Sequence, residues 1–235
     1  MIFAANFKMH HTRASTTEYL DRLDKLLAEA EYPFKTIVFP PATALQPSRE
    51  WITVGAQNAY PEERGAFTGE IGLDQLKEFG LDTVLIGHSE RRNILGEEQE
   101  FLAKKFAFYA GHGFQIVYCV GEPLEVREAG DEAVAEYLWE QFDGIDLDYE
   151  RLVVAYEPIW AIGTGRAAKV EEIAATHAEL RRRIARPILY GGSVKPTNIK
   201  EIASVKDVDG VLVGGASLEV ESFFSLMVAI APPQV

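Results

Sequence analysis

Short apolar runs recur along the chain and alternate with longer amphipathic stretches. Each run has four to six residues, the length of a buried strand in a parallel sheet. There are eight of them: Ile2–Phe7, Thr36–Phe39, Ile52–Gln57, Thr83–Ile86, Gln115–Val120, Leu152–Tyr156, Pro187–Tyr190 and Val208–Val213. Their recurrence predicts a sheet of eight strands.

The stretches between the runs have the residue spacing of amphipathic helices. In the first, apolar residues from Tyr19 to Ala30 recur at helical intervals, and charged residues occupy the other face. Ser15, with Glu18 three residues later, predicts the N-terminal cap of this helix. Similar spacing predicts helices at Phe101–Tyr109, Lys169–Ala185 and Leu218–Ile230.

Alternating strands and helices predict an α/β protein with a parallel sheet and right-handed crossovers. Eight such units in 235 residues match the size of a closed (β/α)8 barrel, here a single domain over residues 1–235 without a linker. A doubly wound sheet is the alternative. That fold usually has a GxGxxG turn after its first strand, whereas this strand ends Asn6-Phe7-Lys8 with no glycine. The barrel is therefore favoured.

The charge and composition limit the possible partners. A formal net charge of −13 argues against binding nucleic acid, and it means that any phosphate site must gain positive potential locally. No run reaches the ~18 consecutive apolar residues of a membrane span, and no signal peptide opens the chain. The single cysteine, Cys119, cannot form an intramolecular disulfide. We expect a cytoplasmic protein.

One carboxylate stands where a general base is expected. Glu157 directly follows the apolar run Leu152–Tyr156, and the active site of a (β/α)8 barrel lies at the carboxyl ends of its strands. Pro158 fixes φ at the start of the following loop, while Gly163 and Gly165 permit the dihedral angles of a closing lid. Taken alone, the Glu157-Pro158 pair is more typical of an N-cap glutamate in an ordinary glycine-containing connection; the motifs at other strand ends favour the base.

Polar residues also follow the first and fourth strands. Asn6 and Lys8 are two residues apart and therefore on one face, although a lone lysine there could be a surface residue. His88 stands before a short helical turn that begins at Ser89, whose N–H groups would favour the neutral imidazole. The other four histidines are interpreted as surface or core residues: His10, His11, His112 and His177.

Paired glycines follow the last two strands. They occur in Tyr190-Gly191-Gly192-Ser193 and in Val213-Gly214-Gly215. Glycine lets the backbone approach an anion closely, and N–H groups at helix starts then point at it. Each pair alone could be a tight turn. The two in succession match the phosphate position of (β/α)8 barrels, after strands seven and eight.

Over its whole length the chain resembles the triosephosphate isomerase family, whose fold is the TIM barrel. The resemblance rests on Asn6-Phe7-Lys8, Gly55–Asn58, Gly65–Glu70, Gly87–Arg92, Cys119–Glu122, Tyr156–Gly165, Tyr190–Val194 and Leu212–Gly215. It implies interconversion of dihydroxyacetone phosphate and glyceraldehyde 3-phosphate through an enediolate, in glycolysis and gluconeogenesis, without a cofactor or a metal. A carboxylate base beside a neutral histidine is a known feature of that family.

The resemblance also implies a role for each site residue. Glu157 is the base that moves the carbon-bound proton, His88 polarises the carbonyl, and Asn6 and Lys8 stabilise the oxyanion. N–H groups at four positions bind the substrate phosphate: Gly163, Ser193, Gly214 and Gly215. Supporting positions are Ser89, Glu90 as the ion-pair partner of Lys8, Cys119, Glu122 and Tyr190 as a latch for the lid. Cys119 could equally be a packing residue.

The resemblance further implies a homodimer. The Gly65–Glu70 loop is expected to enter a second subunit, with Thr68 near that subunit's Asn6, Lys8 and Glu90. Two other interpretations remain open: another phosphosugar isomerase or epimerase, and a phosphate-binding scaffold without turnover. The first would need further polar groups, and the second should have lost Lys8, His88 or Glu157.

Overall fold

The computed structural model describes residues 1–162 and 167–231. Its strands are β1 Ile2–Asn6, β2 Lys35–Phe39, β3 Ile52–Val54, β4 Thr83–Ile86, β5 Gln115–Val120, β6 Leu152–Tyr156, β7 Ile188–Tyr190 and β8 Gly210–Val213. Its helices are α1 Arg13–Ala30, α2 Leu73–Glu78, α3 Ser89–Asn93, α4 Gln99–Gly111, α5 Leu124–Glu128, α6 Asp131–Glu140, α7 Val170–Arg181, α8 Ile199–Ser204 and α9 Val220–Ile230. Three short 3-10 turns are η1 Ala42–Ala44, η2 Ile159–Ala161 and η3 Gly215–Ser217.

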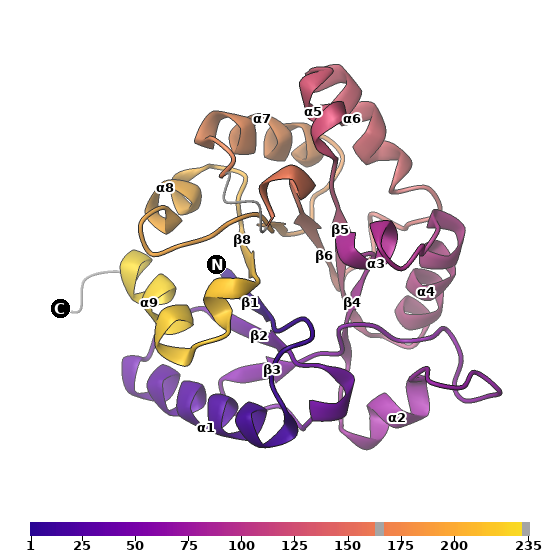
Figure 1. Ribbon diagram of the computed structural model, residues 1–235, viewed down its shortest axis with the longest axis vertical. Helices are drawn as coiled ribbons and strands as arrows, with labels where there is room; N and C mark the ends of the chain where they lie inside the picture. Colours follow the sequence, from indigo (N-terminus) through magenta and orange to yellow (C-terminus); the bar gives the residue numbers. More distant parts are fainter. Residues whose placement is uncertain (163–166, 232–235) are drawn as a thin grey trace.

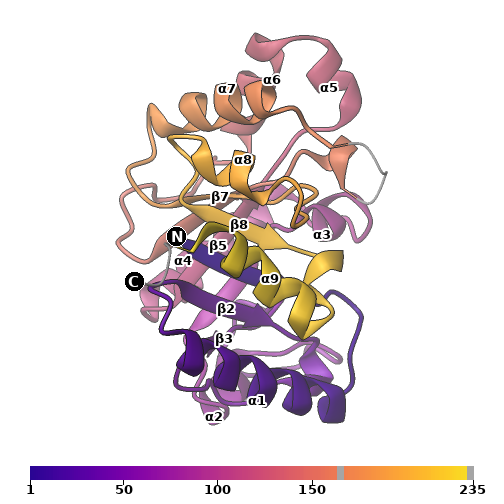
Figure 2. The same cartoon turned by 90° about the vertical axis from the view of Figure 1, so that its left-hand side faces the viewer.

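The strands form a parallel barrel surrounded by helices, which confirms the predicted fold (Figure 1). They are ordered β3-β2-β1-β8-β7-β6-β5-β4, with paired neighbours throughout. The barrel closes between β3 and β4 through one bridge, Ala56 to Val84, just beyond the end of β3. The strands point toward the side on which α3 lies (Figure 2), so their carboxyl ends share one rim of the barrel.

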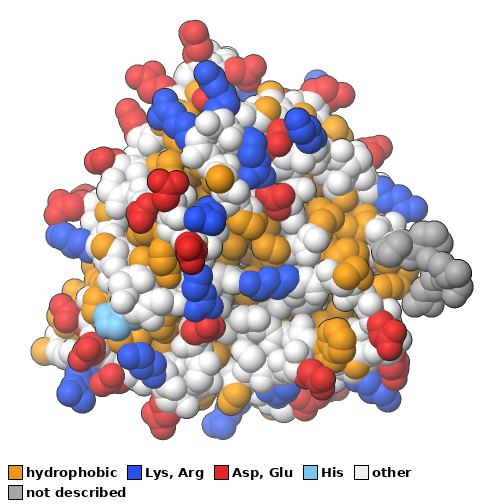
Figure 3. Space-filling view, turned by 180° about the vertical axis from the view of Figure 1, so that it is seen from behind, with side chains coloured by type: hydrophobic (Ala, Val, Ile, Leu, Met, Phe, Trp, Pro, Cys, Tyr) orange, Lys and Arg blue, Asp and Glu red, His pale blue; other side chains and the backbone are white. Residues whose placement is uncertain are grey.

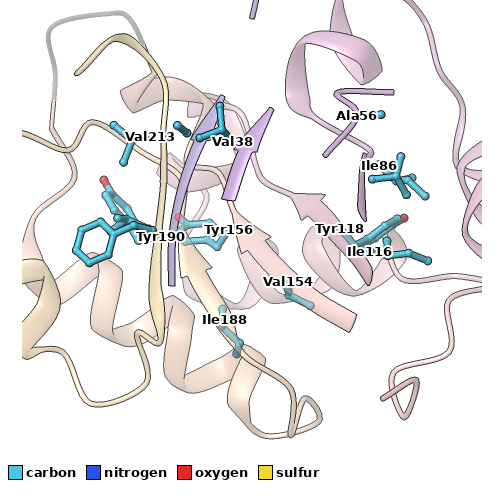
Figure 4. Close-up of a cluster of buried hydrophobic side chains, with 14 of the residues drawn as sticks. Val38, Ala56, Ile86, Ile116, Tyr118, Val154, Tyr156, Ile188, Tyr190 and Val213 are labelled. Carbon is cyan, nitrogen blue, oxygen red and sulfur yellow. The ribbon is translucent and has the colours of Figure 1, made fainter. Parts of the chain in front are cut away.

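Alternate strand residues divide the apolar core in two. One set fills the barrel interior and includes Ala4, Ile37, Leu85, Val117 and Leu212, all nearly inaccessible. The other set faces the helices, and Figure 4 shows part of it projecting from neighbouring strands. This alternation follows from the two-residue repeat of a strand whose both faces are buried. The packed interior holds the strand ends, and the residues that follow them, in fixed positions.

The predicted helix boundaries hold to within a few residues, but the predicted cap of the first helix is wrong. Helix α1 begins at Arg13, and its N-cap is Thr12, which accepts from the N–H of Ser15. Ser15 occupies the third helical position and accepts from the backbone of Thr12, completing a capping box. Serine here takes the place of the usual glutamate or glutamine, so the Ser15–Glu18 pair misplaced the start by one turn.

The outer surface carries both signs of charge. Acidic and basic side chains are interspersed on the face seen from behind the view of Figure 1 (Figure 3). In the part of the chain that the structure describes, no helix is long and apolar enough to cross a membrane.

Candidate active site

A cavity of about 390 Å³ opens at the carboxyl ends of the strands. It is formed by segments that follow β1, β4, β6, β7 and β8, which are far apart in the sequence. Seven of the residues singled out from the sequence line it together: Asn6, Lys8, His88, Glu157, Ser193, Gly214 and Gly215. The fold therefore brings the predicted polar residues and both glycine turns to one place.

Glu157 lies at the centre of this arrangement. It follows β6, is 2% exposed, and its own N–H bonds to the carbonyl of Val120 on β5 at 2.8 Å. Glycines that directly follow the two neighbouring strands, β5 and β7, give it room. A Cβ at Gly121 would lie 1.8 Å from the Glu157 carbonyl oxygen, and one at Gly191 would lie 2.9 Å from its Cγ. Gly191 thus serves to seat the carboxylate, a use of glycine that the sequence pattern does not indicate.

Two groups from the start of α3 hold the Glu157 carboxylate. The Ser89 N–H donates to Oε2 at 2.9 Å, and Nε2 of His88 lies 3.0 Å from Oε1. On the opposite side of the imidazole, the Glu90 N–H donates to Nδ1 of His88 at 3.2 Å. Because Nδ1 accepts this bond, Nε2 carries the proton in the neutral ring and donates it to Glu157. The predicted N–H group aimed at the ring is present.

The two side chains shift each other's pKa in opposite directions. Burial alone would raise the pKa of Glu157 and lower that of His88, since it disfavours both charges. Their mutual attraction outweighs burial, so the pKa of Glu157 is lowered and that of His88 is raised. Once Glu157 moves away, its charge no longer raises the pKa of His88. Burial, the Glu90 N–H and the charge of Lys8 then favour the neutral ring, while the Glu90 carboxylate, 3.5 Å from Nδ1, favours the charged one. The expected neutral imidazole therefore depends on where the carboxylate lies.

Lys8 is held by an ion pair and by an unusual backbone conformation. Its Nζ lies 2.7 Å from Oε1 of Glu90, the predicted partner. Its φ of 49° falls in the left-handed region that non-glycine residues rarely adopt. The Lys8 N–H donates to Oδ1 of Asn6 at 3.0 Å, and its carbonyl accepts from Gln57 at 2.8 Å. These bonds stabilise the strained turn, which directs both Asn6 and Lys8 into the cavity wall.

The turns after β7 and β8 present backbone to the same cavity. Gly215 opens the 3-10 turn η3, and a Cβ there would meet nothing within 4 Å. A Cβ at Gly214 would lie 3.2 Å from Cε of Lys8, so this glycine lets the lysine pass. Glycine is required at position 192 for a different reason, because a Cβ there would lie 2.2 Å from the Tyr190 hydroxyl oxygen. Of these three glycines, only Gly215 leaves its surroundings open to a ligand.

Cys119 and Glu122, at the end of β5, lie behind the cavity. Cys119 is fully buried in the barrel interior, and burial together with the nearby Glu157 raises the pKa of its thiol. Glu122 is also fully buried. Its Oε1 accepts from Arg127, from the Tyr156 hydroxyl at 3.0 Å and from Nε1 of Trp160 at 2.9 Å. Through Trp160, Glu122 anchors the turn η2 that directly follows Glu157.

The structure describes Tyr190, the expected latch of the lid, but not the lid glycines. Tyr190 is buried, its pKa is raised mainly by burial, and its hydroxyl bonds to the backbone of Ala168. Ala168 lies three residues beyond Gly165, so this contact links Tyr190 to the segment that follows the lid glycines. Gly163 and Gly165 lie outside the described residues. Pro158 has φ −66°, as expected, and precedes η2.

Several cavity residues were not selected as site residues from the sequence, and three of them bear on the site. They are His10, Ile162 and Lys195. His10 was interpreted as a surface or core residue; it is exposed, and it also lines the cavity wall. No periodicity marks a residue in an irregular turn. Only nearness along the chain to a selected residue could have indicated these three: His10 follows Lys8, Ile162 follows Glu157 and Lys195 follows Ser193. Among the described residues, no group of three His, Cys, Asp or Glu side chains is arranged to hold a metal ion.

Known proteins match the chain along nearly its full length. The sequence model of the family described as "Triosephosphate isomerase" matches residues 1–230. The triosephosphate isomerase of a Sulfurovum species is 63% identical over 229 residues, 97% of this chain and 100% of that protein. That of a Nitratiruptor species is 56% identical over 227 residues, 97% of each chain. That of Wolinella succinogenes is 52% identical over 229 residues, 97% of this chain and 99% of that protein.

Proposed function

The chain belongs to the triosephosphate isomerase family, and we propose that the cavity at the strand ends is the site of its reaction. That reaction is the interconversion of dihydroxyacetone phosphate and glyceraldehyde 3-phosphate, an intramolecular exchange of aldose and ketose. The observation that carries the assignment is a buried carboxylate, Glu157, 3.0 Å from His88 in a cavity that Lys8 also lines. This set contains a base, a proton donor and a cation for one enediolate.

Glu157 is the base in this proposal. Its lowered pKa keeps it ionised at neutral pH, because the attraction of His88 and the Ser89 N–H outweigh burial. Those same bonds must be exchanged before the carboxylate can take a proton from a substrate carbon, since a base needs hydrogen-bond reach of that proton. The chain therefore offers Glu157 two positions, one bonded to Ser89 and one beside the substrate.

His88, Lys8 and Asn6 stabilise the charge that forms on oxygen. When Glu157 leaves, Nε2–H of His88 is freed to donate to the carbonyl, and the Glu90 N–H on Nδ1 keeps that tautomer. A neutral imidazole can give and take a proton between the two enediolate oxygens. The Lys8 ammonium adds a fixed positive charge, which lowers the energy of the oxyanion without proton transfer.

The phosphate end of the substrate is assigned to the turns after β7 and β8. Ser193, Gly214 and Gly215 line the cavity on the side away from β5, the strand partner of Glu157. Backbone N–H groups at the start of a helical turn attract an anion. This placement leaves the reactive carbons of a three-carbon substrate between the turns and the carboxylate.

The active form is proposed to be a homodimer joined through the Gly65–Glu70 loop. The loop projects outward between β3 and α2 (Figure 1), and its Phe67 packs against Tyr60 with the ring centroids 4.1 Å apart and the rings tilted by 31°. A second hollow of about 290 Å³ beside the active site is lined by Lys8, Glu90, and the exposed Met9 and Leu95. Exposed apolar side chains around a hollow favour burial against a partner. The loop of a second copy, led by Thr68, fits this description.

The proposed location is the cytoplasm, in keeping with the expected place of the pathway that consumes and supplies triose phosphates. Two alternatives were a different sugar phosphate isomerase and a scaffold without turnover. The family match argues against the first, and the retained Lys8, His88 and Glu157 argue against the second.

A coupled assay tests the proposed function. Purified protein receives glyceraldehyde 3-phosphate, and formation of dihydroxyacetone phosphate is followed by its reduction with a dehydrogenase. Turnover that a phosphoglycolate-type anion inhibits competitively is expected. Absence of turnover in both directions, with the protein folded and the coupling enzyme in excess, would reject the assignment.

A further inference from the structure

The substrate of the proposed function is strongly anionic, but the protein is too. A phosphate monoester carries about −1.5 to −2 charges at neutral pH, and the chain has a formal net charge of −13. The long-range field therefore opposes substrate entry, and a local cation must offset it. The lysines in the wall of the active-site cavity are Lys8 and Lys195.

Lys8 cannot supply this attraction at a distance. It is paired with Glu90 at 2.7 Å, so an approaching anion meets a nearly neutral pair. The Glu157 carboxylate lies in the same wall and adds a negative charge. Lys8 is effective once the substrate contacts it, but these three groups together do not attract an anion from solution.

Lys195 is placed differently. It is exposed, it follows Ser193 by two residues, and it lines the cavity beside the turn assigned to the phosphate. Within residues 1–162 and 167–231, no carboxylate lies within 4.0 Å of its ammonium group. Its charge is therefore not cancelled by a neighbour in that part of the chain, and its exposed position in the cavity wall leaves it accessible to an anion in solution.

The backbone at Lys195 is fixed by one side chain. The amide of Asn198 accepts from the Lys195 N–H at 2.7 Å and donates to the carbonyl of Ser193 at 3.0 Å. The Asn198 N–H also bonds to the Lys195 carbonyl at 3.1 Å. These bonds tie both ends of the Ser193–Lys195 segment to the start of α8, so the lysine is held beside the phosphate turn.

We propose that Lys195 is a substrate-binding residue that draws the phosphate group into the cavity and remains beside it at the Ser193 turn. The inference rests on the proposed function, because it assigns the phosphate to this turn. It concerns capture and binding of the anion, not proton transfer. Its effect should therefore appear mainly in KM and kcat/KM, and it should weaken as salt screens the charge.

Three variants separate this role from a general effect of charge. Lys195→Met removes the ammonium group but keeps an unbranched chain, and Lys195→Arg restores a cation. Lys200→Met is the matched control, because Lys200 is an exposed lysine on nearby α8 that does not line the cavity. Both methionine variants make the net charge more negative by one.

Isomerisation is measured for all forms at ~0.01 M and ~0.3 M ionic strength, where the Debye length is about 30 Å and below 10 Å, respectively. At low salt, Lys195→Met should lower kcat/KM about 5-fold, through KM, whereas Lys195→Arg and Lys200→Met stay within about twofold of wild type. The deficit should shrink to less than about twofold at high salt. An equal loss in Lys195→Met and Lys200→Met, or a loss confined to kcat, would overturn the proposal.

A binding measurement keeps this test apart from that of the function. Wild type and Lys195→Met are titrated with inorganic phosphate in a calorimeter, a measurement that needs no turnover. Weaker phosphate binding by Lys195→Met supports the proposal, and identical binding at low salt contradicts it. If the wild type bound phosphate through Lys195 but did not isomerise triose phosphates, the proposed function would fail and the lysine's role would stand.

Discussion

The Nε2 atom of His88 lies 3.0 Å from Oε1 of Glu157, so the two side chains proposed to move protons are bonded to each other. Each stabilises the charged form of the other, which lowers the pKa of Glu157 and raises that of His88. A substrate that separates them therefore changes both at once: it frees Nε2–H as a donor and removes the charge that raised the pKa of His88. The contact couples the state of the base to that of the imidazole.

Replacing Glu157 with glutamine should lower turnover at least ~10²-fold in both directions, because the amide keeps the shape but cannot accept the carbon-bound proton. Steady-state assays measure the loss, and circular dichroism checks the fold. Glu171→Gln on the exposed face of α7 is the matched control and should retain wild-type turnover. A Glu157→Gln enzyme with near-normal rates would move the role of base to another residue.

Lys8→Met should lower kcat/KM by ~10²-fold or more, since the variant loses the ammonium that stabilises the oxyanion. Glu90→Gln, which removes the ion-pair partner but keeps the cation, should show a smaller loss. Lys25→Met, at an exposed position of α1, serves as control for the change in net charge. If kcat/KM of Lys8→Met equalled that of the control, backbone N–H groups alone would suffice at this site.

Shortening the Gly65–Glu70 loop should convert dimers into monomers of reduced activity. Sedimentation velocity and the coupled assay, run on the same samples, relate mass to rate. Dilution of the wild type supplies the comparison, because its specific activity should fall at the concentration where dimers dissociate. A fully active monomer would separate assembly from catalysis.

The stability of the protein should depend on pH through His177. This residue is fully buried beside the rings of Tyr156 and Tyr190, its Nε2 has no hydrogen-bond partner among the described residues, and burial lowers its pKa from 6.5 to about 4. Since the unfolded chain binds the proton more tightly, its contribution is full above pH 6.5 and is lost as pH falls toward 4. The loss is on the order of 3 kcal/mol.

Urea unfolding at fixed protein concentration between about pH 7.5 and 4 checks this. His177→Phe, which cannot titrate, should show a shallower fall in unfolding free energy than wild type over this range. His112→Gln, at an exposed histidine, should keep the wild-type slope. Parallel curves for wild type and His177→Phe would show that another group causes the acid sensitivity.

The barrel was predictable because buried parallel strands leave a strong signal in apolar runs. Strands β4, β5 and β6 begin and end at the predicted residues. The run Ile52–Gln57 overestimates β3, which ends at Val54, since Gly55 bonds back to β2 while Ala56 turns to β4. Side-chain pattern alone cannot show where a strand changes its partner.

The site was predictable where polar residues directly follow strands, as at Glu157 and His88. It was not predictable at Lys195 and His10, because their place in the wall depends on how irregular turns fold back. The purpose of individual glycines was also hidden. Gly191 and Gly192 make room for Glu157 and the Tyr190 hydroxyl, a need that exists only after β6 and β7 are side by side.

The closure of the barrel has a consequence for where the molecule opens first. Elsewhere adjacent strands share between two and five aligned residue pairs, but β3 and β4 meet only at the bridge from Ala56 to Val84. This seam separates the proposed dimer loop, which follows β3, from His88, which follows β4. Local opening at the seam would displace the imidazole relative to Glu157 without unfolding the other strands. A second subunit bound over the hollow beside Lys8 would hold β3 and β4 together. Dimer formation would then keep the imidazole of His88 in position relative to Glu157.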